Sequence, residues 1–449
     1  MYGMPLSQAL VFVAAAVVIV AASRRIHPFI VIAIVAAAFG YIAGYPTSQL
    51  GSAFGSGFSE KLYSPGLVIV TASVIAGLAE GTSAVERLAG LIARHRVIAG
   101  NRIPAIVGLV AGLGASPASA FALVSPLLPA FGGAKAHNRP GAGLTLALAI
   151  SASHGLAVLT PVPIAAVAIL GAQWSRVALF GVPLAIVLAV CGALFAHWSL
   201  PAHAAPPPPE PERAGKPRGV GSLAVLLLAI AVPLLALMEQ SLGGMPSEPF
   251  GGGTTRELII GVGRPLILFL VGLGIMIVGQ PRHSFGRLTD ADWAGGALGR
   301  VGGILVVIGA AGGLQRLCQQ TGMAEMLGER VLGWHLGALA VLIPFLVAAA
   351  IKTLQGSSLV AAITTAGMVQ PLLQSLGVDG ANGRALAALA IGAGAMTVCH
   401  VNDEYFWLVA DRAGLTPPRG LATIAGGTAL QGLVAAALLV ALSLLTGSR

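Results

Sequence analysis

Residues 352–358 read Lys-Thr-Leu-Gln-Gly-Ser-Ser and interrupt an apolar segment that extends over about 335–376. A similar interruption, Gly-Ala-Ser-Pro-Ala-Ser at 114–119, divides the apolar segment 103–131. Non-helical backbone is tolerated at membrane depth where it is buried in protein or lines a cavity. We therefore predict two re-entrant hairpins, at about 103–131 and 335–376, that turn at these interruptions and enter the membrane from opposite faces.

The composition supports a membrane protein around these hairpins. Of 449 residues, 56% are hydrophobic and 9% are charged, whereas soluble domains carry about 25% charged residues. A transmembrane helix needs roughly 20 apolar residues, or a few fewer with favourable flanks, and the chain offers about ten such spans. Their cores are 8–22, 29–44, 65–79, 141–170, 177–197, 220–238, 264–280, 301–314, 384–411 and 420–446.

One linker divides the chain into two parts. Residues 199–219 contain Pro206 to Pro209 followed by several charged residues, which is typical of a stiff, solvated spacer. We predict a first transmembrane repeat at 1–198, a cytoplasmic linker, and a second repeat at 220–449. Each half contains spans, a hairpin and a discontinuous span, the pattern of inverted repeats. The predicted fold class is an all-α polytopic membrane protein with two inverted-topology repeats, each with a re-entrant hairpin and a discontinuous helix.

The sequence also argues against several classes of protein. The net charge of +9 comes from basic residues in short loops between apolar runs, which fits the positive-inside rule better than nucleic-acid binding. The loops at 45–64 and 239–256 are poorer in basic residues, so we place them and both chain ends outside. The three cysteines form no CxxC pair, and no nucleotide-binding GxxxxGK[ST] or hydrolytic HExxH or GxSxG motif is present. We expect no cofactor, no metal site, no ATP-driven step and no enzyme.

The discontinuous spans carry the polar residues of most interest. The first contains Ser151, Ser153, His154 and Thr160, and the second contains Cys-His-Val-Asn-Asp-Glu at 399–404. Hairpin breaks and unwound helices that meet near the membrane midplane would point helix N-termini at one cavity, which suits an anion and a coupling cation. The structural alternative is that serines and threonines bond their own backbone and that Gly-Pro pairs only kink helices.

Charged residues in these segments leave alternatives open. A histidine within hydrocarbon is costly unless it faces a polar interior, which favours a functional reading of His154 and His400. Lys352 either neutralises an anionic ligand or extends to the outer surface. For Asp403 we favour the cavity, and for Glu404 an interface.

Two long motifs in the second half, at 352–367 and 399–407, permit comparison with known families. The second reads Cys-His-Val-Asn-Asp-Glu-Tyr-Phe-Trp and resembles the Ser-His-Val-Asn-Asp-Ser-Gly-Phe-Trp motif of the gluconate:proton symporter (gluconate permease) family, within the wider ion transporter superfamily. The first resembles that family's hairpin motif, and Ile-Gly-Ala-Ala-Gly-Gly at 308–313 is similar to its glycine motif. The first half diverges, because residues 154–163 carry Thr160 where the family motif His-Gly-Leu-Val-Pro-Pro-His-Pro-Gly-Pro has its second histidine.

The resemblance implies a secondary active transporter in the bacterial inner membrane. Its substrate would be a small organic anion, a sugar acid such as gluconate or a related hydroxy- or amino-acid, taken up with protons. Sodium stays open as the coupling ion, and the fold implies a homodimer in the lipid bilayer. An exporter or cation/proton antiporter of the same superfamily is the alternative, followed by a channel.

The hypothesis for the site places the substrate carboxylate between the hairpin tips, with His400 or Asp403 taking the coupling proton. The predicted substrate-binding residues are Ser116, Ser119, Ser153, His154, Thr160, Lys352, Gln355, Gly356, Ser357, Ser358 and Asn402.

Overall fold

A computed structural model describes most of the chain. The described residues are 25–67, 69–70, 102–113, 116–131, 139–157, 160–200, 223–243, 248–262, 264–279, 296–321 and 339–446, with isolated positions at 14–22 and 87–91. Within these ranges the secondary structure is helical and contains no strand, so the all-α class is confirmed for them. The predicted spans 8–22 and 65–79 lie mostly outside the described residues, as does nearly all of the linker 199–219.

The helix boundaries follow the predicted apolar runs closely in the second half of the chain. The helices are α2 (Pro28–Ile42), α3 (Thr47–Lys61), α6 (Arg102–Ala111), α7 (Pro117–Val124), α8 (Leu128–Phe131), α9 (Arg139–Leu156), α10 (Pro161–Leu170), α11 (Trp174–Ser199), α12 (Leu223–Gly243), α13 (Thr254–Val262), α14 (Pro265–Val278), α15 (Gly296–Gln320), α17 (Leu342–Gln355), α18 (Ser358–Val369), α19 (Ala381–Ala395), α20 (Glu404–Ala413), α21 (Pro417–Gly420) and α22 (Gly426–Thr446).

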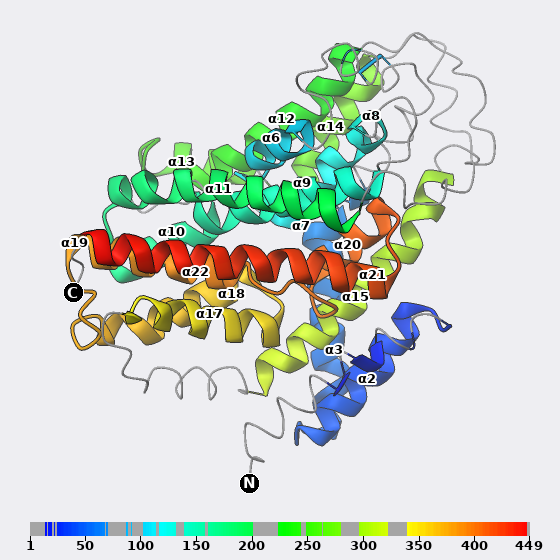
Figure 1. The fold of residues 1–449 in the computed structure, drawn as a ribbon. Coiled ribbons are helices and arrows are strands. Elements are labelled where there is room, and N and C mark those ends of the chain that lie inside the picture. Colours follow the sequence, from blue (N-terminus) through cyan, green and yellow to red (C-terminus); the bar gives the residue numbers. More distant parts are fainter. Residues whose placement is uncertain are drawn as a thin grey trace.

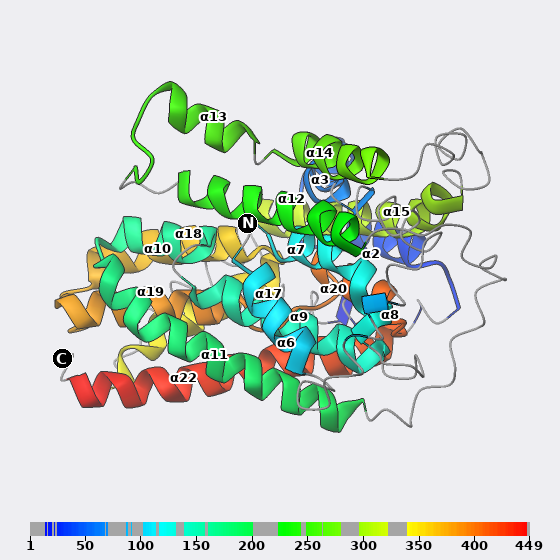
Figure 2. The same ribbon diagram turned by 90° about the horizontal axis from the view of Figure 1, so that it is seen from above.

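The helices pack in three groups. In the largest, α9 packs against α6 and α11, α17 against α18 and α19, and α22 against α11 and α19; α11 and α22 run along its surface (Figure 1). A second group, α2, α3 and α15, lies at one edge of the first and reaches it through α15 (Figure 1). The third group, α12 to α14, covers another side (Figure 2).

Three helical segments of the described chain are long and apolar enough to cross a membrane: Arg139–Leu170, Trp174–Ser199 and Pro417–Thr446. Others are apolar but shorter, such as the 15-residue α2 and the 14-residue α14. Fewer helices than the ten predicted spans therefore meet the length criterion, because some predicted spans are divided by breaks and others lie outside the described residues. Large apolar side chains such as Leu179 and Leu433 are exposed, as expected where a helix faces lipid.

Four helix breaks lie where the polar interruptions were predicted. Helix α6 ends at Ala111 and α7 begins at Pro117, and α17 ends at Gln355 and α18 begins at Ser358. Helix α9 ends at Leu156 and α10 begins at Pro161, and α19 ends at Ala395 and α20 begins at Glu404. Gly356 ends α17 with a φ of +76°, and a Cβ there would overlap the carbonyl oxygen of Asn402. Glycine is therefore required at this break. The inverted relation of the two halves and the membrane depth of the breaks stay predictions.

Residues 45–64 differ from the sequence prediction, which made them a loop. Residues Thr47–Lys61 form α3, a helix rich in glycine and serine. The sequence does not predict this helix, because its residues have a weak intrinsic helix propensity. Packing against α15 stabilises it. The contact is close because Gly57 and Gly312 face each other, where a Cβ on either glycine would overlap the other helix.

Candidate functional site

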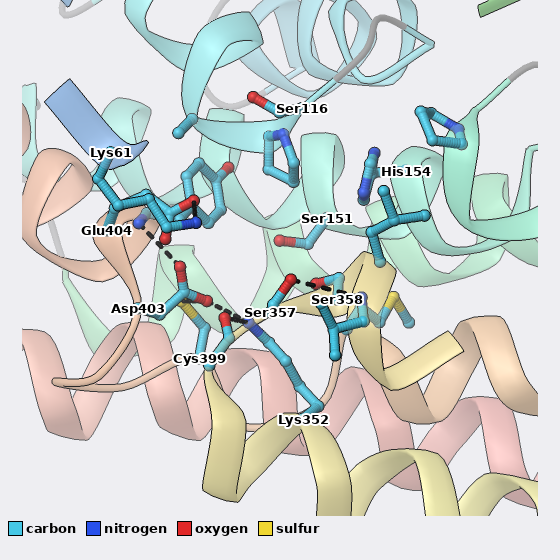
Figure 3. A pocket seen from close by; sticks show the side chains of 18 of the residues that line it. Lys61, Ser116, Ser151, His154, Lys352, Ser357, Ser358, Cys399, Asp403 and Glu404 are labelled. Atoms are coloured by element: carbon cyan, nitrogen blue, oxygen red, sulfur yellow. Dashed lines mark hydrogen bonds and ion pairs between the residues drawn. The ribbon is translucent and has the colours of Figure 1, made fainter. Parts of the chain in front are cut away.

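A cavity of about 260 Å³ lies where α3, the helix breaks and the N-termini of α7 and α18 meet (Figure 3). It is lined by Glu60 and Lys61 at the end of α3, by Ser116, Pro117 and Ala118 at the start of α7, by Ser151, His154 and Pro161 from the first broken helix, by Lys352, Gly356, Ser357, Ser358, Leu359 and Val360 around the α17–α18 break, and by Met396, Cys399, Asp403, Glu404 and Tyr405 from the second broken helix.

A buried ion pair joins two of these elements. The Lys352 ammonium donates to Asp403 Oδ2 and to the carbonyl oxygen of Gly356, the latter at 2.6 Å, and the Lys352 side chain is only 3% exposed. Asp403 also caps α20, accepting from the Tyr405 amide at 2.9 Å, and the Cys399 thiol donates to it at 3.3 Å. Lys352 therefore points into the cavity and does not extend to the surface (Figure 3). Each buried charge is paired, as burial requires.

A second ion pair lies beside the first. Lys61 donates to Glu404 Oε1 at 3.2 Å, with side chains that are 13% and 16% exposed. Glu404, which we expected at an interface, lines the cavity. Lys61 was missed because it ends the segment predicted to be a loop, and no motif in the sequence links it to Glu404.

Two helix N-termini face the cavity. Ser116 has an extended backbone and caps α7, where its hydroxyl oxygen accepts from the Ser119 amide at 3.1 Å and its hydroxyl donates to Ser119 Oγ at 2.9 Å. Ser357 caps α18, accepting from the Val360 amide at 3.4 Å. The first turns of helices leave amide groups without intrahelical acceptors, so both ends favour an anion nearby.

The first broken helix contributes neutral groups. His154 is 4% exposed and lines the cavity, and its Nδ1 has no hydrogen-bond partner among the described residues. Thr160 is fully buried and donates to the carbonyl oxygens of His154 and Ala157 at 2.7 and 2.9 Å, so its hydroxyl is used within the break. Ser153 donates to the Leu109 carbonyl at 2.7 Å, which ties α9 to α6.

Two polar residues of the second break also bond to the backbone. His400 Nε2 donates to the Thr353 carbonyl at 2.8 Å. The Asn402 side-chain amide donates to the carbonyls of Thr353 and Leu354 at 3.0 and 3.2 Å. Both residues therefore attach the second broken helix to the last turn of α17, next to the cavity but outside its lining.

The predicted residues divide into two sets. Those that line the cavity are Ser116, His154, Lys352, Gly356, Ser357, Ser358 and Asp403. Those that lie outside the lining are Ser119, Ser153, Thr160, Gln355, His400 and Asn402.

Besides Lys61 and Glu404, the lining residues that the predicted set omitted include Glu60, Ser151, Cys399 and Tyr405. Cys399 and Tyr405 lie within the motif 399–407, so the motif itself was the available signal. Within the described part of the chain, no three His, Cys, Asp or Glu side chains are arranged to hold a metal ion.

Comparison with known proteins gives a consistent family. A gluconate permease of Pseudomonas aeruginosa is 27% identical over 405 residues, covering 86% of each chain. The Gnt-II system L-idonate transporter of Escherichia coli K12 is 27% identical over 409 residues, covering 89% of this chain and 90% of that protein. Among solved structures, the Alcanivorax borkumensis YdaH transporter aligns with 89% of this chain and 87% of its own, at 18% identity and a TM-score of 0.40.

Residues 4–445 match the family described as GntP family permease. This match confirms the resemblance seen in the motifs, and it includes the first half, where the motif at 154–163 diverges. The relatives are named as permeases and transporters, in agreement with the apolar helices and with a multi-pass membrane protein. The chain therefore belongs to the GntP permease family and is a transport protein, not an enzyme.

Proposed function

We propose that this protein is a secondary active transporter that takes up a small sugar acid, such as gluconate, together with protons. The names of the gluconate and L-idonate relatives support the substrate class. The observation that carries the proposal is the buried Lys352–Asp403 pair in a cavity that two helix N-termini also face. This arrangement offers an anion several donors, and Asp403 can accept a proton.

The size and polarity of the cavity suit such a substrate. Pockets for drug-sized ligands measure about 300–1,000 Å³, so a cavity of about 260 Å³ fits a smaller molecule. Ser116, Ser357 and Ser358 lie around it, and the hydroxyls of Ser357 and Ser358 would donate to a carboxylate. His154, with its unpartnered Nδ1, adds a further polar group to the lining.

Proton coupling follows from the charge balance of the ion pair. While Asp403 is ionised, it holds the Lys352 ammonium, which then has little capacity for a second carboxylate. A proton on Asp403 neutralises this competitor, so that Lys352 can bind the substrate carboxylate instead. One anion and one proton entering together leave the charge of the cavity unchanged. We assign the proton to Asp403 and not to His400, because His400 donates to a backbone carbonyl outside the cavity lining.

The remaining features belong to the same proposal. The pairs α6–α7 and α17–α18 would be re-entrant hairpins from opposite faces, within repeats 1–198 and 220–449 joined by a cytoplasmic linker. With the broken helices they would move as one unit against the other spans, in a homodimer in the bacterial inner membrane. The alternative coupling ion is sodium, and the alternative direction is export.

The test is uptake of radiolabelled gluconate into proteoliposomes with an inward proton gradient. We expect accumulation that an uncoupler abolishes, and no accumulation when a sodium gradient replaces the proton gradient. Asp403→Asn should lose accumulation, and a panel of hydroxy acids and amino acids would define the substrate range. If folded, inserted protein accumulates no acid under any gradient, uptake is wrong and export or ion exchange takes its place.

A further inference from the structure

Helix α3 contributes a wall of the cavity that no motif indicated. It is held against α15 by the close approach of Gly57 to Gly312, and the Lys61 side chain runs over Gly312. A Cβ at Gly312 would overlap the Cγ atom of Lys61. The glycine motif at 308–313 therefore has a specific consequence in this chain: it lets α3 approach closely enough for the Lys61 ammonium to enter the cavity.

The two ion pairs of the cavity differ in how fully their hydrogen bonds are used. The Lys352–Asp403 pair has several further bonds, because Lys352 also donates to Gly356, and Asp403 also accepts from Tyr405 and Cys399. In the Lys61–Glu404 pair, a single bond of 3.2 Å joins the groups. Glu404 Oε2 is buried without a hydrogen-bond partner among the described residues, and no second bond of the Lys61 ammonium is found there.

An unsatisfied buried carboxylate oxygen is costly, since it loses its hydration without a replacement. The cost is recovered if a ligand in the cavity supplies a donor. Lys61 has ammonium hydrogens left to donate to an acceptor on the same ligand. A donor and an acceptor side by side is the pattern that a hydroxyl group offers, and two neighbouring hydroxyls would satisfy both side chains.

Glu404 is a position at which this chain differs from the motif that it resembles. At the position of Glu404, the motif of the gluconate permease family has serine, which cannot form an ion pair with a lysine. Glu404 therefore adds a charge to the cavity, and Lys61 balances it. An added buried pair of charges carries a desolvation cost, which a role in selecting the substrate would explain.

We propose that Lys61 and Glu404 are specificity-determining residues that recognise the hydroxyl groups of the substrate. The Lys61 ammonium donates to one hydroxyl oxygen, and Glu404 Oε2 accepts from a neighbouring hydroxyl. The substrate carboxylate lies at the other pair, with Lys352 and the N-termini of α7 and α18. This assignment rests on the proposed transport function, and it sets the orientation of the substrate: carboxylate toward α17 and hydroxyls toward α3.

The test compares gluconate with hexanoate, which has the same carbon chain and no hydroxyls, in proteoliposomes with an inward proton gradient. We expect the wild type to prefer gluconate strongly, since a site built to bind hydroxyls rejects an analogue without them. Lys61→Met and Glu404→Gln should each raise the KM for gluconate roughly ten- to a hundredfold. The KM for hexanoate should stay the same or fall. The double variant should discriminate least.

A purely structural pair predicts a different pattern. Each single variant would then change the KM for gluconate and the KM for hexanoate equally. The double variant would return both values toward those of the wild type, because no unpaired charge remains. That result would overturn the assignment while leaving the transport function intact. Uptake of serine in place of gluconate, lost in Glu404→Gln, would also overturn it by showing that Glu404 binds an ammonium group. Uptake of no acid at all would overturn the proposed function, and this assignment with it.

A pair of glycine variants on α15 tests the placement of Lys61 without changing a charge. Gly312→Ala should push the Lys61 stem away and raise the KM for gluconate but not for hexanoate. Gly303→Ala, on the same helix with no atom within 4 Å of the added Cβ, should change neither. Thermal unfolding in detergent should be close to wild type for Gly303→Ala. If Gly312→Ala folds and transports both acids as the wild type does, Lys61 does not contact the substrate.

Discussion

The two broken helices of the main helix group are interrupted at similar places but closed differently. In the first, residues 157–160 carry no charge, and Thr160 closes the break by donating to the carbonyls of His154 and Ala157. In the second, residues 396–403 bond outward: His400 and Asn402 reach the end of α17, and Asp403 pairs with Lys352. The first break is satisfied within itself, whereas the second is held by another helix.

This difference separates two tasks within one cavity. The second break joins α17–α18 to α19–α20 through groups that can gain or lose a proton, and our proposal places binding and coupling there. The first break supplies shape and neutral hydrogen-bonding groups, through His154 and Ser151. We therefore expect variants of the second break to affect stability and coupling together, and variants of the first break to have smaller, separate effects.

The largest effect is expected from removing one charge of the buried pair. Lys352→Met leaves Asp403 as an unpaired buried carboxylate, which typically costs about 3–5 kcal/mol. We expect a marked loss of thermal stability in detergent and loss of gluconate uptake. The double variant Lys352→Met/Asp403→Asn should recover most of the stability but no proton-coupled uptake.

The matched control is Asp411→Asn on the same helix as the Asp403 cap. Asp411 is 3.7 Å from Arg412, with a side chain that is 44% exposed, and exposed pairs contribute only about 0–1 kcal/mol. Asp411→Asn should therefore leave the thermal stability and the gluconate uptake near those of the wild type. If Lys352→Met were as stable as Asp411→Asn, the pair would not be the charged centre of the second break.

An intermediate effect is expected from the hydrogen bonds by which uncharged side chains attach each broken helix to its neighbour. Asn402→Ala removes two buried bonds to the end of α17, and Ser153→Ala removes one bond to α6. At about 1 kcal/mol per bond, Asn402→Ala should lower the free energy of unfolding by about 2 kcal/mol and Ser153→Ala by about 1 kcal/mol. Thermal unfolding would measure both. Equal losses, or a larger loss for Ser153→Ala, would remove the contrast between the halves.

The positions of the breaks could be predicted because their residues have local causes. Gly356 supplies a positive φ, and Ser116, Ser357 and Asp403 are helix N-caps. Three of the breaks therefore follow from the conformational preferences of a few neighbouring residues. Their polarity within apolar segments also predicted a shared cavity, and seven of the predicted residues line it.

What the sequence did not predict depends on contacts between distant segments. Helix α3 has no apolar pattern of its own, and it forms because glycines allow it to pack against α15. Lys61 and Glu404 are 343 positions apart, so neither indicates the other. The residue type suggested a substrate contact for Asn402 and a coupling proton for His400, but both side chains donate to carbonyls at the end of α17.

A small loss of stability with no effect on gluconate binding is expected at Thr160, the residue that replaces the second histidine of the family motif. Its hydroxyl is buried and bonds two backbone carbonyls outside the cavity lining. Thr160→Val should therefore cost about 1 kcal/mol of stability and leave the KM for gluconate unchanged, because the valine keeps the shape of the break. Thermal unfolding and uptake kinetics, with Ser153→Ala as the reference for one lost backbone bond, check this expectation. A raised KM with normal stability would mean that the Thr160 hydroxyl turns toward the substrate during transport, so that the first break would take part in binding as the second does.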